Sequence, residues 1–154
     1  LADHYHTGWA PEFAREYLLT LGRPYRYDDL LTIARGQLHA EDEMTNKAGG
    51  PTLFIDTDMY VMKVWCEFVF GKCHSFILDQ IVERTYDLYL LCNTDLPWVK
   101  DELREYPDLV SRNKLFMIYK DLMVNQHIPW VEISGSYEER LQRAIRAVDG
   151  LLLQ

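Results

Sequence analysis

Three short apolar runs along the chain predict the strands of a parallel sheet. They cover residues 52–58, 87–92 and 128–133, and each is mostly apolar until its end. Continuous apolar runs of this length are typical of strands that are covered on both faces. The first run closes with Asp56 and Asp58, and the second is followed by Asn93-Thr94-Asp95. Polar residues after buried strands indicate a ligand site at the carboxyl edge of the sheet.

Apolar residues between these runs recur at helical spacing. Residues 1–9 alternate like a strand entry, and Pro11 then opens a helix that Gly22 ends. Further helices are predicted over residues 28–46, with Asp28 or Asp29 as cap, over residues 59–70, after Ser75, over residues 109–126 and after Ser136. Ser136 and Glu139 have the spacing of a capping box. Gly36, inside a helix, marks close packing or backbone access to a ligand.

Strands that alternate with helices predict an α/β fold. The expected architecture is three layers, a parallel sheet flanked by helices, in one domain over residues 1–154 without internal repeats.

Composition narrows the class of protein. The 16 basic and 24 acidic residues give a net charge of −8, which disfavours a general nucleic-acid partner. No apolar run has transmembrane length and no signal peptide is evident, so we expect a cytoplasmic protein without a membrane partner. Cys66, Cys73 and Cys92 form no Cys-x-x-Cys pair and are expected to be reduced thiols. A homo-oligomer is left open.

Two carboxylates at the end of the first apolar run are the leading candidates for chemistry. Asp56 and Asp58 are suited to holding a hydrated Mg²⁺ or to accepting a hydroxyl proton. The alternative for Asp58 is that it caps the helix that begins at Met59.

The helix after Pro11 carries a charged group, Glu12, Arg15 and Glu16, off its apolar stripe. These three residues cannot all be core. A solvated ion-pairing face and a substrate-binding role are both open for them.

A second charged segment follows the strand at 87–92. It runs from Trp98 through Asp101 to Arg104, with Arg112 beyond. Arg104 and Arg112 are eight residues apart and would reach one anion if the turn at residues 106–107 folds them together. Such arginines suit phosphoryl transfer, and Trp98 could stack on an aromatic ligand. A surface salt-bridge helix is the alternative.

Five stretches in order resemble a known family. They are Pro-Glu-Phe-Ala-Arg-Glu-Tyr at 11–17, Ile-Ala-Arg-Gly-Gln at 33–37, Phe-Ile-Asp-Thr-Asp at 54–58, Pro-Trp-Val-x-Asp-x-Leu-Arg at 97–104 and Gly-Ser-Tyr-Glu-Glu-Arg at 135–140. Together they resemble the ribosylnicotinamide kinase domain of the NadR family and its stand-alone ATPase/kinase relatives. The resemblance covers nearly the whole chain.

The resemblance implies a P-loop kinase fold that uses Mg-ATP to phosphorylate the 5′-hydroxyl of a nucleoside such as ribosylnicotinamide. It implies a substrate pocket lined by Glu12, Arg15 and Glu16, with Asp56 and Asp58 serving the substrate hydroxyl and the metal. It also implies a phosphate-clamping lid over residues 98–112, which include Trp98, Asp101, Arg104 and Arg112.

Two departures from the family pattern limit the carry-over. Pro11 stands where the family has a Trp that stacks on nicotinamide, and Trp9 is not that position. The chain also lacks Gly-x-x-x-x-Gly-Lys-Ser/Thr, so it looks as though it starts after the P-loop and its first strand. We therefore expect little ATP affinity from these residues alone. A non-catalytic remnant or interaction domain is the alternative function.

Overall fold

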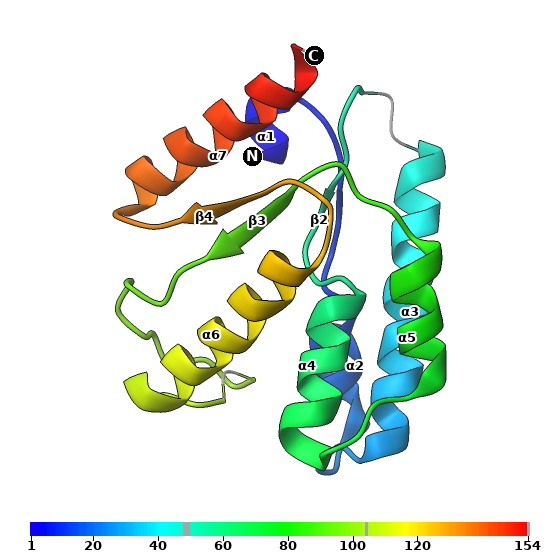
Figure 1. The fold of residues 1–154 in the computed structure, drawn as a ribbon. Helices are drawn as coiled ribbons and strands as arrows, with labels where there is room; N and C mark the ends of the chain where they lie inside the picture. The colour runs from blue at the N-terminus through cyan, green and yellow to red at the C-terminus, as the bar shows by residue number, and fades with distance from the viewer. Residues whose placement is uncertain (48–49, 104, 154) are drawn as a thin grey trace. The chain divides into compact units, whose positions relative to one another are not determined.

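A computed structural model describes residues 1–47, 50–103 and 105–153 (Figure 1). The chain divides into two compact units, Leu1–Arg84 and Thr85–Gln154, and each is described by itself.

The first unit combines a short parallel sheet with four longer helices. Its elements are α1 (Ala2–Tyr5), β1 (Trp9–Ala10), α2 (Phe13–Leu21), α3 (Tyr27–Lys47), β2 (Phe54–Ile55), α4 (Met59–Phe70) and α5 (Ser75–Glu83). Strand β1 pairs with β2 in parallel, with Trp9 opposite Phe54 and Ala10 opposite Ile55. The helices α2, α3, α4 and α5 run beside one another (Figure 1).

Local signals placed most helix ends correctly, and three expectations were wrong. Asp28 and Asp29 lie in the first turn of α3, which begins at Tyr27, so neither is its cap. Gly22 and Gly71 end α2 and α4 at φ values of 67° and 69°, as predicted. The strand entry expected at residues 1–9 is in part the one-turn helix α1, which His6 closes at a φ of 50° with its N–H bonded to the carbonyls of Ala2 and Asp3. Ser75 is the first residue of α5 and not its cap, because His74 takes that position.

The apolar core of the first unit lies between its helices. Leu30 and Ile33 of α3, Met62 of α4 and Ile77 of α5 are fully buried, and each such side chain contributes about 1.5–3 kcal/mol by leaving water. Gly36 is where α3 meets α2: a Cβ there would lie 2.2 Å from the Phe13 ring. Close packing is therefore the reason for this glycine.

A buried carboxylate joins α2 to α3. Asp29 is 6% exposed. Its two oxygens accept hydrogen bonds from the Arg23 guanidinium at 2.7 and 2.9 Å, from the Arg26 N–H at 2.7 Å and from the Tyr17 hydroxyl at 2.8 Å. The Arg23 hydrogen bonds, and after them the Arg26 amide, hold the pKa of Asp29 well below its usual range. Asp29 thus lies in the first turn of α3 and accepts the N–H of Arg26, the residue before the helix.

The second unit is a helix–sheet–helix arrangement. Its elements are β3 (Tyr89–Cys92), α6 (Leu109–Asn125), β4 (Trp130–Ile133) and α7 (Tyr137–Leu152). Strands β3 and β4 are parallel, with Tyr89 opposite Trp130 and Cys92 opposite Ile133. Helix α6 packs on β3 and α7 packs on β4, on opposite sides of the sheet (Figure 1).

The predicted capping box of the last helix is confirmed. The Ser136 hydroxyl accepts the Glu139 N–H at 3.4 Å, and the Glu139 carboxylate accepts the Ser136 N–H at 2.7 Å. On the expected apolar stripe of α7, Ile145 and Val148 are buried, whereas Leu141 and Leu152 are partly exposed.

The α/β fold with parallel strands is confirmed. Within the described residues the strands form two sheets of two strands each. One domain over residues 1–154 stays a prediction.

The contacts of Asp29 make the stability of the fold depend on pH. Because the folded pKa of Asp29 is depressed, its contribution is present above the unfolded pKa, near pH 4, and is lost as pH falls through the folded pKa. We expect Asp29→Asn to lower the melting temperature at pH 7, and the deficit to shrink as the pH falls below about 4. Thermal melts across this pH range check the expectation, with the exposed Asp79→Asn as control. A deficit that is the same at every pH would contradict it.

Candidate functional site

The carboxyl edge of β1–β2 carries two exposed acids. The Asp56 N–H donates to the Ala10 carbonyl at 3.3 Å, which continues the parallel ladder one residue beyond β2. In that register Pro11 lies opposite Asp56, and Glu12, the N-cap of α2, follows Pro11. The side chains of Glu12 and Asp56 are both exposed. The structure therefore brings these two predicted site residues to the same edge of one sheet.

A buried glutamine ties that edge to helix α3. Gln37 is 0% exposed, and its Oε1 accepts the Phe13 N–H at 2.8 Å. Its Nε2 donates to the Pro11 carbonyl at 3.1 Å and to the Asp56 carbonyl at 3.3 Å. Gln37 lies in the family-like stretch at residues 33–37, and no role was predicted for it. The sequence feature that could have identified Gln37 is its position as a polar residue on the apolar stripe of α3, between Ala34 and Leu38.

The turn from β2 into α4 has a strained residue and a helix cap. Thr57 has a φ of 81°, which a β-branched residue rarely adopts. Asp58 follows as the N-cap of α4, and its Oδ1 accepts the Val61 N–H at 3.0 Å. The cap interpretation of Asp58 is therefore confirmed. Its roles toward a metal or a substrate stay predictions.

The charged face of α2 is solvated, as expected from its position off the apolar stripe. Arg15 and Glu16 are exposed like Glu12, whereas Ala14 between them is 1% exposed. Glu12 is the N-cap of α2, yet its side chain makes no capping hydrogen bond. These three residues follow strand β1 in the sequence, and Asp56 follows its partner strand β2. Contact of the three residues with a substrate stays a prediction.

The carboxyl edge of β3–β4 is closed by hydrogen bonds of its own. Asp95 accepts the Gly135 N–H at 2.6 Å and forms an ion pair with Arg140. Arg140 also donates to the carbonyls of Gly135 at 3.0 Å and Asn93 at 2.9 Å. The Gly135 amide, and after it Arg140, lowers the pKa of Asp95. This network fixes the loops that follow both strands.

Arg112 is joined to the same loop. Its Nη2 donates to the carbonyls of Thr94 and Leu96, each at 3.0 Å. Its partner in the predicted anion clamp, Arg104, lies outside the described residues. Trp98 and Asp101 are half-buried, and Asp101 accepts the Leu103 N–H at 3.0 Å. The catalytic role of Arg104 and Arg112 and the substrate roles of Trp98 and Asp101 stay predictions.

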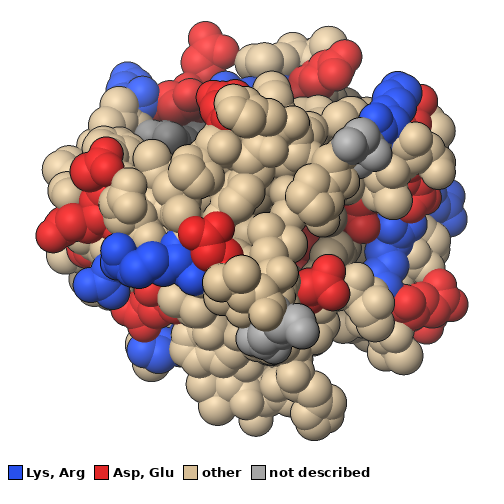
Figure 2. Space-filling model, turned by 90° about the horizontal axis from the view of Figure 1, so that it is seen from above, with Lys and Arg blue, Asp and Glu red and all other residues tan. Residues whose placement is uncertain are grey.

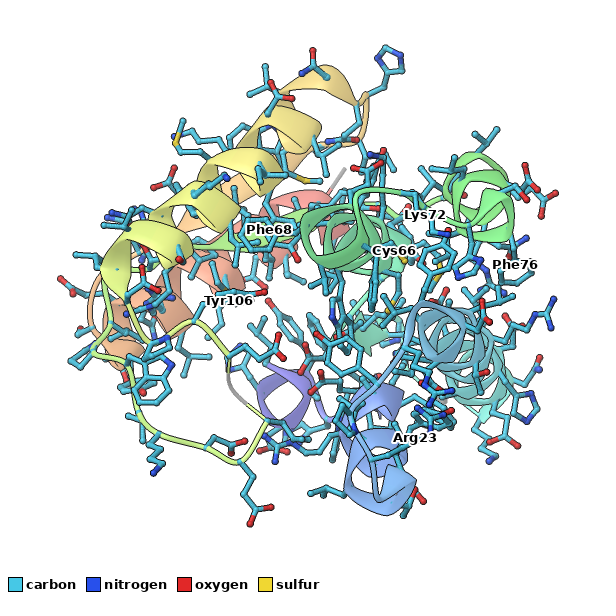
Figure 3. All side chains as sticks on the ribbon, turned by 90° about the horizontal axis from the view of Figure 1, so that it is seen from below. Arg23, Cys66, Phe68, Lys72, Phe76 and Tyr106 are labelled. Atoms are coloured by element: carbon cyan, nitrogen blue, oxygen red, sulfur yellow. The ribbon has the colours of Figure 1, made fainter. Side chains whose placement is uncertain are left out.

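The remaining chemistry of the described residues is limited. No group of three or more His, Cys, Asp or Glu converges on a metal position in residues 1–47, 50–103 and 105–153. Cys66 lies among the helices of the first unit (Figure 3), and burial, together with the charge of Cys73, raises the pKa of its thiol to about 12. Cys66 therefore stays protonated at neutral pH and is not a nucleophile.

The sequence has fewer basic than acidic residues, 16 against 24, and the surface shows both kinds. On the face drawn in Figure 2, basic side chains lie beside acidic ones and do not form one continuous basic field. In the part of the chain that the structure describes, no helix combines the length and the apolar character that crossing a bilayer needs.

Comparisons with known proteins place the chain. A family model described as an AAA domain matches residues 1–140. The chain is 29% identical over 153 residues to the trifunctional NAD biosynthesis/regulator protein NadR of Escherichia coli (strain K12), and this covers 96% of the chain and 37% of NadR. It is 28% identical over 157 residues to the same protein of Salmonella typhimurium (strain LT2), covering 99% of the chain and 38% of that relative.

A solved structure shares the fold. The crystal structure of NadR protein in complex with NR superposes with a TM-score of 0.76 at 20% identity, over 97% of this chain and 44% of that one. The fold thus defines an α/β domain of the P-loop class, and the resemblance to NadR is confirmed. The chain belongs to the AAA domain family whose model it matches. It spans about two-fifths of the length of the curated relatives.

The cap at Asp58 gives a stability prediction. We expect Asp58→Ala to lower the free energy of unfolding by about 1 kcal/mol, because the Val61 N–H loses its acceptor. Asp58→Asn should retain most of that stability, since an amide oxygen can also cap a helix. Urea denaturation of the three proteins measures both effects. Equal loss in Asp58→Asn and Asp58→Ala would contradict the cap as the source of the stability.

Proposed function

We propose that this chain is the nucleoside-binding and phosphoryl-accepting part of an ATP-dependent phosphotransferase. The substrate would be a nucleoside such as ribosylnicotinamide, phosphorylated at its 5′-hydroxyl in NAD salvage. The NAD-related names of the curated relatives and the NR-bound structure of NadR support the choice of pathway and ligand. The observation that carries the proposal is the pair of exposed carboxylates, Glu12 and Asp56, at the carboxyl edge of two parallel strands.

Asp56 would act on the hydroxyl that receives the phosphoryl group. An ionised carboxylate is an acceptor only, so it orients a hydroxyl by taking its hydrogen bond and can then take its proton. Its backbone is fixed on both sides, by the Asp56 N–H to Ala10 and by the Asp56 carbonyl to Gln37, while the side chain stays exposed. A rigid backbone with an accessible carboxylate suits this role. Glu12, Arg15 and Glu16 would bind the other polar groups of the nucleoside.

A magnesium ion fits the same edge. Mg²⁺ keeps several waters and binds proteins through one or two carboxylates. Asp56 is exposed and would be the main ligand, whereas one oxygen of Asp58 is already engaged by the Val61 N–H. When bound, the ion would neutralise charge on the phosphates.

The usual phosphate-binding loop of ATP-dependent kinases does not occur in these residues. The 154 residues contain no Gly-x-x-x-x-Gly-Lys-Ser/Thr sequence, so the proposed catalytic steps do not involve such a loop. For this reason the tests use the protein expressed from its complete reading frame.

The Asp56 carboxylate is the residue to test. We expect Asp56→Asn to reduce phosphoryl transfer from ATP to ribosylnicotinamide by at least about 100-fold, because general-base assistance is worth roughly 10²–10⁴-fold. The melting temperature should stay unchanged, since the side chain is exposed. Steady-state assays and thermal melts measure both, with Asp79→Asn as an exposed control.

Unchanged turnover in Asp56→Asn would remove Asp56 from the mechanism. A wild-type protein that binds no Mg-ATP in calorimetry would overturn the kinase proposal altogether and favour the non-catalytic interaction domain.

A further inference from the structure

We propose that Gln37 is a positioning residue that holds Glu12 and Asp56 as one pair. The inference rests on the proposed function, because it concerns the same sheet edge. One side chain reaches three backbone groups: the Phe13 N–H, the Pro11 carbonyl and the Asp56 carbonyl. Phe13 and Pro11 flank Glu12, and the third group belongs to Asp56 itself. The backbone on either side of Glu12 and the backbone of Asp56 are therefore placed relative to each other through Gln37.

The amide of glutamine is the group that these three contacts require. Its oxygen accepts a hydrogen bond and its nitrogen donates two, which matches one N–H and two carbonyls. A carboxylate could accept from Phe13 but could not donate to the carbonyls, and an apolar side chain could do neither. Because Gln37 is 0% exposed, water cannot replace a lost partner without opening the structure.

Gln37 also supplies the cap that Glu12 does not. An N-cap side chain normally accepts an N–H of the first helical turn. In α2 the Glu12 side chain makes no such bond, and Gln37 accepts the Phe13 N–H from another helix. The start of α2 is thus satisfied without the Glu12 carboxylate, which is exposed at the edge beside Asp56.

The rest of α3 makes Gln37 a rigid anchor. Ile33 and Ala34 are fully buried and Leu38 is 5% exposed, so the turns around Gln37 are fixed in the core. The neighbouring Gly36 lets the Phe13 ring approach the helix. Sites built on packed helices hold their geometry better than sites on loops, and a misplacement of about 1 Å can cost roughly 100-fold in rate.

The test replaces Gln37 by an unbranched residue that makes no such hydrogen bonds. In the protein from its complete reading frame, we expect Gln37→Met to raise the KM for ribosylnicotinamide at least about tenfold, by a larger factor than the KM for ATP, and to lower kcat. The nucleoside KM should move because Glu12 and Asp56 both change position.

Glu41→Gln is the matched control. Glu41 is also a buried polar residue of α3, one turn further along, and it pairs with Arg84 of the α5 end at 2.9 Å. This variant should lower the melting temperature and leave both KM values at the wild-type level. A nucleoside KM that is unchanged in Gln37→Met, or that rises equally in Glu41→Gln, would overturn the inference.

A second variant and a second measurement keep the outcome decisive. If Gln37→Met does not fold, Gln37→Leu removes the acceptor for Phe13 and both donors in a shorter side chain, and the nucleoside KM must again rise for the inference to stand. If the wild-type protein transfers no phosphoryl group, the proposed function fails, and amide hydrogen exchange decides the positioning. The Gln37 variant should then speed exchange at both Phe13 and Asp56, and unchanged exchange at Asp56 would overturn the inference.

Discussion

The parallel pairing of β1 and β2 is the contact on which the candidate site depends, and by itself it is short. Each strand has two residues, and an isolated pair of strands is at best marginal in water. Side chains extend the pairing at both ends. The Thr7 hydroxyl donates to the Thr52 carbonyl before the strands, and Gln37 joins Pro11 to Asp56 after them. The edge is thus held by polar side chains as much as by the ladder.

The carboxyl edges of the two sheets use their acids differently. At β3–β4, Asp95 is engaged by the Gly135 amide and by Arg140, and the pKa of Asp95 is lowered by these contacts. Such an acid fixes loops. At β1–β2 the backbone groups are satisfied by Gln37, and the carboxylate of Asp56 is exposed. A neutral amide thus satisfies the backbone of this edge while the Asp56 carboxylate stays exposed, and we therefore place the substrate chemistry in the first unit.

What the sequence predicted well was local. Helix ends at Gly22, Gly71 and Asp58, and the capping box of Ser136 and Glu139, follow from residues a few positions apart. The α/β class followed from apolar runs alternating with helical periods, and the family resemblance followed from ordered stretches.

The role of Gln37, which the sequence did not predict, depends on contacts between distant residues, whereas the error at residues 1–9 has a local cause. Gln37 bonds to groups 19 to 26 residues away in the sequence, so a local pattern could mark it as a polar residue on an apolar stripe but could not identify its partners. The first residues alternate like a strand but form the helix α1 instead. The left-handed backbone conformation of His6 lets its N–H donate to two carbonyls of that helical turn.

Arg112 illustrates how a loop contact and a ligand role can coexist. The family resemblance implied a phosphate clamp, and the structure shows the Nη2 group bound to the carbonyls of Thr94 and Leu96. A guanidinium has five N–H donors in a planar fork, and these two bonds involve one nitrogen. An anion that approached the opposite side of the fork would meet an arginine whose orientation is already set, and the entropy of ordering that side chain would have been spent in folding. Anchoring to the loop is therefore compatible with the predicted clamp and would make it stronger.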